Sequence, residues 1–93
     1  MAWHENTTGY ELMTLKNRYE DFRRKLSKHH KKLTENDLNL CIMLRAGVAT
    51  KEMAELLNIT PDSVKKAKHR LRKKFDIPPD LLWRDFLISI DDQ

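Results

Sequence analysis

Positively charged side chains are concentrated in one short stretch of the sequence, between residues 65 and 74. Seven of these ten residues are lysine or arginine, and none is acidic. The apolar residues Val64, Ala67 and Leu71 recur at spacings of three and four, so a helix here has an apolar face opposite a basic one. Such a face attracts polyanions, with an unengaged, solvated surface as the alternative. The basic residues are Lys65, Lys66, Lys68, Arg70, Arg72, Lys73 and Lys74.

The residues from 50 to 59 predict a short helix followed by a tight turn. Thr50 is expected to cap this helix with its hydroxyl group. Asn58 lies where the chain must turn, because asparagine tolerates the left-handed backbone conformation better than most residues other than glycine. Ile59 is then expected to fill the corner between this helix and the next. The inward-facing residues of the short helix are Met53, Ala54 and Leu57.

A second helix is predicted from residue 61 to about residue 75. Thr60 can serve as its N-cap, and Pro61 suits the first helical position, where the missing N–H costs no hydrogen bond. The two helices together have the pattern of a helix-turn-helix. In such a unit the N-terminal part of the second helix enters the major groove of DNA.

The exposed residues of the second helix are predicted to divide between two kinds of DNA contact. Lys65, Lys66 and His69 project furthest from the buried face and are expected to read base edges, since lysine donates to guanine O6 and N7. Residues toward the flanks of this helix, or at the start of the preceding one, are better placed for phosphates. Asp62 is excluded because its charge repels phosphate. The predicted phosphate contacts are Thr50, Lys51, Ser63, Lys68, Arg70 and Lys73.

Little in the sequence indicates catalysis or metal binding. Cys41 lies within the apolar run LNLCIML and is predicted to be a small buried residue, not a nucleophile. His29 and His30 are adjacent, so on a helix they point about 100° apart and do not chelate a metal ion together. We therefore expect no catalytic residues, no metal site and no cofactor, and we do not expect an enzyme. A single cysteine also suits a reducing cytoplasm.

The composition predicts one small all-α domain with an N-terminal extension. The 93 residues carry a net charge of +4, and no alternating β-branched run predicts a strand. We divide the chain into residues 1–32, a linker or dimerisation element, and residues 33–93, the helix-turn-helix domain. The polar N-terminus does not resemble a signal peptide, and no apolar run approaches the roughly 18 residues of a membrane span. We therefore expect a cytoplasmic protein without membrane contact.

An apolar seam runs along the N-terminal extension, which is predicted to form one long helix from about residue 9 to residue 32. Neither proline nor an internal glycine interrupts this range. The seam either pairs with a second copy in a parallel coiled coil or folds back on the domain's own core, and the basic residues around it favour the coiled coil. The seam residues are Leu12, Leu15, Tyr19, Phe22 and Leu26.

The remaining helix boundaries follow from capping signals and proline. Thr34 and Asp37 resemble a capping box, and they start a helix for which Gly47 is the stop signal. Prolines 78 and 79 break the chain after the basic helix. A closing helix is then predicted to carry Leu82, Trp83, Phe86, Leu87 and Ile90. The predicted core consists of Leu38, Ile42, Met53, Ala54, Leu57, Ile59, Val64, Leu71 and Phe75.

The order of elements from Leu33 to Ile77, about half of the chain, resembles the LuxR/GerE-type helix-turn-helix family. The segment LTENDLNLCIMLRAGVATKEMAELLNI is similar to the family pattern LTxxExxVLxLxxxGxxxKEIAxxLxI, and TPDSVKKAKHRLRKKFDI is similar to SxxTVKxHxxxIxxKLxV. The sequence departs from the pattern at Asp37, where the family has Glu, at Cys41, and at Ala67, where the family often has His. The resemblance implies a long N-terminal helix followed by a four-helix domain of the winged-helix-like superfamily, at the end of a larger sensor-regulator chain.

These observations together predict a sequence-specific DNA-binding domain of a transcriptional regulator. The family resemblance implies the same base contacts from Lys65, Lys66 and His69. Two alternatives stay open. One is the promoter-reading region of bacterial sigma factors, which shares the KEMAELL-type core, and the other is a protein-interaction module that does not bind DNA. The expected partners are double-stranded DNA and a second copy of the chain in a homodimer, with RNA polymerase as a further candidate contact.

Overall fold

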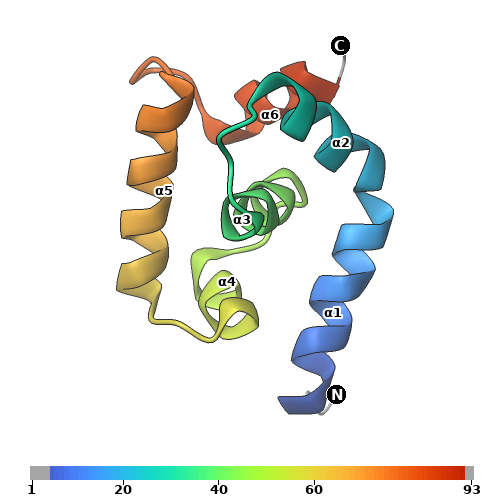
Figure 1. Ribbon diagram of the computed structural model, residues 1–93. Coiled ribbons are helices and arrows are strands. Elements are labelled where there is room, and N and C mark those ends of the chain that lie inside the picture. The colour runs from blue at the N-terminus through green and yellow to red at the C-terminus, as the bar shows by residue number, and fades with distance from the viewer. Residues whose placement is uncertain (1–4, 92–93) are drawn as a thin grey trace.

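The chain is entirely helical over the residues that the structure describes. The computed structural model describes residues 5–91, with side chains from residue 11 onward, and contains no strand in that range (Figure 1). The all-α prediction is therefore confirmed for this range, while the first four residues of the predicted 1–32 segment lie outside it. No helix within the range is both long and apolar enough to cross a membrane. The helices are α1 (Glu5–Arg18), α2 (Glu20–His29), α3 (Glu35–Arg45), α4 (Thr50–Leu57), α5 (Pro61–Phe75) and α6 (Trp83–Asp91).

Helix α3 lies in the middle of the molecule, with the other helices arranged around it (Figure 1). Helices α1, α2 and α6 pack directly against α3, and α1 also packs against α4. Helix α5 packs against α4 and lies at the edge of the molecule, on the side opposite α1 (Figure 1). One flank of α5 is therefore attached to the core, while the other faces away from the protein.

The N-terminal segment forms two helices in place of the single helix that the sequence predicts. Tyr19 separates them, with φ −106° and ψ 30°, outside the helical region. Backbone hydrogen bonds continue through the bend, because the Tyr19 amide donates to the Leu15 carbonyl (3.0 Å) and the Tyr19 carbonyl accepts from the Arg23 amide (2.9 Å). The bend lets α1 follow α3 and α4 while α2 follows α3 and α6, which one straight helix could not do.

The apolar seam of this segment packs on the domain's own core. Phe22 and Leu26 are buried, and Leu26 has no exposed surface. Leu12, Leu15 and Tyr19 are half-buried against the same core. Of the two uses that the sequence leaves open for the seam, the single chain shows the second, although the seam's basic surroundings favoured a coiled coil. The homodimer itself stays a prediction.

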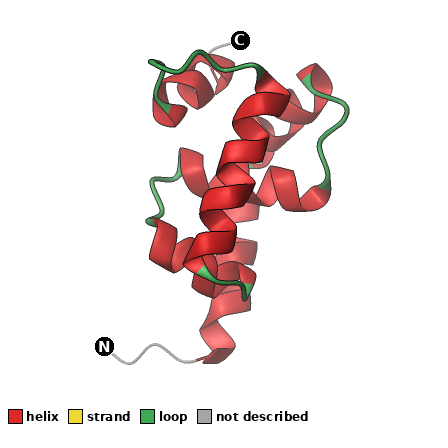
Figure 2. Cartoon of the chain, turned by 90° about the vertical axis from the view of Figure 1, so that its left-hand side faces the viewer, coloured by secondary structure: helices red, strands yellow, loops and turns green. Residues whose placement is uncertain are grey.

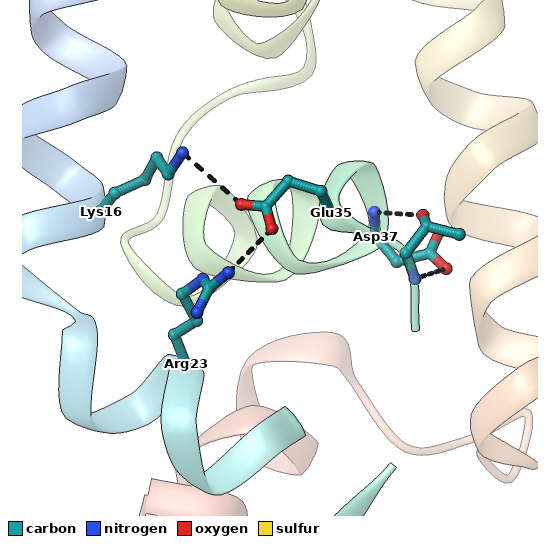
Figure 3. A network of polar contacts seen from close by, with 5 residues as sticks. Lys16, Arg23, Glu35 and Asp37 are labelled. Carbon is teal, nitrogen blue, oxygen red and sulfur yellow. Dashed lines mark hydrogen bonds and ion pairs between the residues drawn. The ribbon is translucent and has the colours of Figure 1, made fainter. Parts of the chain in front are cut away.

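Two predicted capping signals at the ends of α3 are confirmed. The Thr34 hydroxyl accepts from the Asp37 amide (3.1 Å), and the Asp37 carboxylate accepts from the Thr34 amide (3.0 Å), which together form the capping box (Figure 3). Gly47 follows the end of α3 with φ +79°, in the left-handed region that glycine adopts without strain.

The turn between α4 and α5 has the predicted backbone but begins from a different cap. Asn58 is left-handed (φ 58°, ψ 46°), and the Thr60 hydroxyl accepts from the Ser63 amide (3.1 Å) with Pro61 as the first helical residue. The prediction that Thr50 caps α4 is wrong. Ala49 occupies the cap position without a side-chain hydrogen bond, and Thr50 is already helical.

The predicted core is correct except at the corner between α4 and α5. Ile59 was expected to fill this corner but is 42% exposed, and Leu57 is half-buried. Backbone hydrogen bonds close the corner instead, from the Asn58 amide to the Glu55 carbonyl (3.2 Å) and from the Ile59 amide to the Ala54 carbonyl (2.9 Å). No large side chain is therefore needed to fill it. The predicted core residues that are buried are Leu38, Ile42, Met53, Ala54, Val64, Leu71 and Phe75.

The packing of α2 can be tested with a matched pair of leucine substitutions. Leu26→Ala should lower the free energy of unfolding by about 2–5 kcal/mol, because it opens a cavity in the core. Leu82 is 67% exposed, so Leu82→Ala should change the stability by less than about 0.5 kcal/mol. Urea unfolding followed by circular dichroism, at two protein concentrations, measures both. Equal stability of the two variants would contradict the packing of α2 on this core.

Candidate nucleic-acid interface

The outward surface of α5 carries all three residues that the sequence predicts to read bases. Lys65, Lys66 and His69 are exposed, while Val64, Leu71 and, to a lesser extent, Ala67 face the core. Figure 2 shows α5 running across the front of the molecule, with α4 behind its lower half. The three side chains therefore share the side of the helix that no other described element covers. Their contact with bases stays a prediction.

Four of the seven cations between residues 65 and 74 have a protein partner in the described range, and two of these, Arg72 and Lys74, join α5 to other elements through hydrogen bonds shorter than 3 Å. The Arg72 guanidinium donates to the carbonyls of Pro78 (2.7 Å) and Leu81 (2.8 Å) and lies 5.7 Å from the centre of the Trp83 ring. The Lys74 ammonium donates to the Asp37 carboxylate (2.7 Å). Arg72 therefore holds the chain that leads to α6, and Lys74 ties the end of α5 to the start of α3. Sequence reasoning assigned neither role, because both partners lie outside α5.

The remaining cations of α5 are largely free of protein partners. Lys65, Arg70 and Lys73 make no hydrogen bond or ion pair within the described part of the chain. Lys66 pairs with Asp62 one turn away (3.3 Å), but both side chains are about three-quarters exposed (77% and 75%). An exposed pair of this kind is worth about 0.3–0.5 kcal/mol, so a phosphate or a base edge can readily replace it.

Five of the six predicted phosphate contacts lie in two groups, one where the start of α4 meets α5 and one on the C-terminal half of α5. In the first group, the Lys68 ammonium donates to the Thr50 hydroxyl at the start of α4 (3.4 Å), and Lys51 is exposed beside Thr50. Arg70 and Lys73 form the second group, which is exposed on the C-terminal half of α5.

Ser63, the sixth predicted phosphate contact, lies apart from both groups. It is exposed in the first turn of α5, where its hydroxyl accepts a hydrogen bond from the Thr60 hydroxyl (2.9 Å). Basic or hydroxyl side chains thus border the base-reading residues toward both ends of α5.

The carboxylates at the start of α3 neutralise other cations, not those on the outward surface of α5. Glu35 accepts from the Arg23 guanidinium (2.8 Å) and lies 3.5 Å from the Lys16 ammonium (Figure 3). The hydrogen bond from Arg23 is the main cause that lowers the pKa of Glu35. Burial raises the pKa of Asp37, but the hydrogen bonds from Lys74 and Thr34 outweigh it, and the net pKa is lowered. Both carboxylates therefore stay ionised in structural ion pairs at neutral pH.

The cysteine and histidine residues of the described range do not form a reactive or metal-binding group. Burial, with a smaller contribution from the Asp37 charge, raises the pKa of Cys41 to about 12, so its thiol stays protonated at neutral pH. His30 packs edge-on against Phe75, with ring centres 4.6 Å apart, while His29 is exposed. No cluster of three or more His, Cys, Asp or Glu side chains in this range could hold a metal ion.

Comparison of the chain with protein-family models, with curated proteins and with solved structures finds no match. The resemblance to LuxR/GerE-type domains therefore rests on the residues quoted for it.

The buried carboxylate of Asp37 should make the stability of the fold depend on pH. Its pKa is lowered from 3.8, so the carboxylate stabilises the fold above that pH, and the contribution is lost as the pH falls through the pKa of the folded state. Asp37→Asn should therefore cost about 1–3 kcal/mol at pH 7 and flatten the fall in stability below about pH 4. Urea unfolding across this pH range measures both effects. Asp80→Asn, at an exposed turn, is the control, and equal stability of the two variants at pH 7 would refute the role of Asp37.

Proposed function

We propose that this chain is a sequence-specific DNA-binding domain of a transcriptional regulator, with α5 as the helix that enters the major groove. The observation that carries the proposal is the unneutralised basic surface of α5, which lies over a buried apolar face. Lys65, Arg70 and Lys73 are exposed without protein partners in the described range, although the same helix supplies Arg72 and Lys74 to structural contacts. Cations kept free of ion pairs on one helix are typical of a surface that binds polyanions.

The proposed roles of the side chains follow from their positions on α5 and α4. Lys65, Lys66 and His69 contact base edges. The phosphate contacts come from the flanks of α5 and the start of α4, where they fix the register of α5 on the duplex. These contacts are Thr50, Lys51, Ser63, Lys68, Arg70 and Lys73.

We also propose that α3 to α6 form a LuxR/GerE-type unit and that residues 1–32 are the element that leads into it. This division is supported by the α4–α5 turn, with Asn58 left-handed and Thr60 as N-cap, at the positions where the family pattern has its own turn. A transcriptional regulator of this kind acts in the cytoplasm. RNA polymerase is then a further partner.

Direct binding to DNA can be measured by fluorescence anisotropy with duplexes selected from a random pool. With about five phosphate contacts, log affinity should fall with log salt at a slope near −4 to −5. Lys65→Ala and Lys66→Ala should each cost about 1–3 kcal/mol and relax the preference at one or two base pairs. Lys73→Ala should weaken binding to all duplexes alike and reduce the slope by about 0.9.

Arg84→Ala is the matched control for these variants, since Arg84 is exposed on α6 and has no partner in the described range. It should leave binding nearly unchanged at physiological salt, where screening acts over about 8 Å. A chain that binds no duplex at low salt would refute the proposal and favour the protein-interaction alternative. Binding that requires RNA polymerase would favour the sigma-factor alternative.

We further propose that two copies bind a palindromic site as a two-fold dimer, because one recognition helix reads only a few base pairs. Two exposed apolar side chains are candidates for the dimer contact. Leu82, next to the closing helix, is 67% exposed, and Met13 on α1 is 53% exposed. Sedimentation equilibrium should show two copies per palindromic duplex. Leu82→Asp should weaken binding of the second copy, whereas Met13→Asp should do so only if α1 forms the contact. A complex of one copy per duplex would refute the dimer.

A further inference from the structure

A second concentration of positive charge lies outside α5, where α2 leads into α3. The sequence from residue 28 to residue 32 reads Lys-His-His-Lys-Lys. Lys28 and His29 are exposed at the end of α2, and Lys31 and Lys32 are exposed in the turn that follows. None of these three lysines makes an ion pair or a side-chain hydrogen bond within the described range. This run has no role in the interface that the sequence predicts.

The fold places this run against the C-terminal end of α5, although the two segments are more than forty residues apart in the sequence. Together they line an open pocket of about 430 Å³. Phe75, Leu33 and the His30 ring provide its apolar lining, and the lysines supply its charge. The lining residues are Lys28, His29, His30, Lys31, Lys32, Leu33, Lys74 and Phe75.

The electrostatics of this pocket favour an anion. Among the described residues, Asp37 is the one acid that forms an ion pair with a lining residue, and its carboxylate is already engaged by Lys74 and Thr34. The charges of Lys28, Lys31 and Lys32 are therefore uncompensated. Apolar walls of low dielectric constant strengthen the field between such charges and an anion. Lysine ammonium groups bind phosphate as point charges from flexible stems, so they require no fixed angular geometry.

The position of the pocket at the end of α5 favours a phosphate group of the DNA backbone as the anion. Helix α5 has 15 residues and is therefore about 22 Å long, whereas the major groove is about 12 Å wide. When the N-terminal half of α5 lies in the groove, its C-terminal end reaches the strand that borders the groove. Lys73 is exposed at that end, and the pocket begins at the next residue, Lys74.

We propose that this pocket binds a phosphate group from the backbone of the duplex that α5 contacts. The turn between α2 and α3 then acts as a second anchor on DNA, which fixes the position of α5 along the groove without reading bases. This inference rests on the proposed function for the source of the phosphate, whereas the affinity of the pocket for phosphate can be tested without DNA.

The first test compares two double variants that remove the same charge from exposed positions. Lys31→Gln/Lys32→Gln alters the pocket and keeps most of each aliphatic stem. Arg18→Gln/Arg84→Gln alters α1 and α6, where neither arginine has a partner in the described range. Circular dichroism melts should show that both variants keep the stability of the parent chain.

Binding is measured by anisotropy with a duplex that extends one helical turn beyond the selected site on each side. The pocket variant should weaken binding to all sequences alike, and its salt slope should be smaller in magnitude by about 1 to 2. The control should keep the parent slope. If the pocket variant and the control have the same slope while Lys73→Ala reduces it, the proposed function stands and the assignment of the pocket to DNA is overturned.

The second test uses inorganic phosphate alone, titrated against chloride at equal ionic strength. Backbone amide signals in two-dimensional NMR spectra should shift at residues 28–33 and 74–75 of the parent chain and stay in place in the pocket variant. Shifts here without a change in the salt slope would identify a site for free phosphate and overturn its assignment to DNA. No shift at these residues would overturn the pocket as a phosphate site, whatever the chain does with DNA.

Discussion

The arrangement of this chain depends on the complete burial of the middle of α3. Residues 37–43 are all buried, including the two polar residues Asp37 and Asn39. A helix without a solvent-facing side needs covering on every flank, and no single neighbour can provide it. Helices α1, α2 and α6 each pack against α3 directly. Helix α4 lies below α3 in Figure 1 and packs against α5. The bend at Tyr19 follows from the same requirement, because it lets one N-terminal segment cover two different parts of this central helix and its neighbours.

Burial of α3 also determines which charged side chains form ion pairs within the fold and which stay free on its surface. The carboxylate of Asp37 cannot be left in the interior without partners, so it holds Lys74 at the end of α5. Glu35, on the exposed first turn of α3, holds Lys16 from α1 and Arg23 from α2 on either side of the bend (Figure 3). These ion pairs attach three neighbouring helices to the start of α3. Apart from Lys66, which pairs with Asp62 one turn away, the outward cations of α5 have no acidic partner within the described residues.

The basic surface of α5 therefore consists mainly of cations that are not engaged in contacts with the rest of the fold. Arg72 and Lys74 lie at the two borders of the buried face, where they meet the chain before α6 and the start of α3. Lys65, Arg70 and Lys73 form a second group, which is exposed and has no partner in the described range. Binding to a polyanion would draw on this second group and leave the first in place, so the proposed DNA binding and the stability of the fold would involve different cations of the same helix.

The local features of this fold could be predicted from the sequence because each depends on residues within one or two turns. The Thr34–Asp37 capping box, the left-handed Asn58, the Thr60 cap and the alternation of apolar and basic faces on α5 are all of this kind. The bend at Tyr19, the exposure of Ile59, the internal use of the apolar seam and the partners of Arg72 and Lys74 were decided only by the tertiary structure. The meeting of the 28–32 run with the end of α5 belongs to the same group. Each of these depends on which distant element covers a side chain, and the spacing of residues along one helix contains no information about its neighbour.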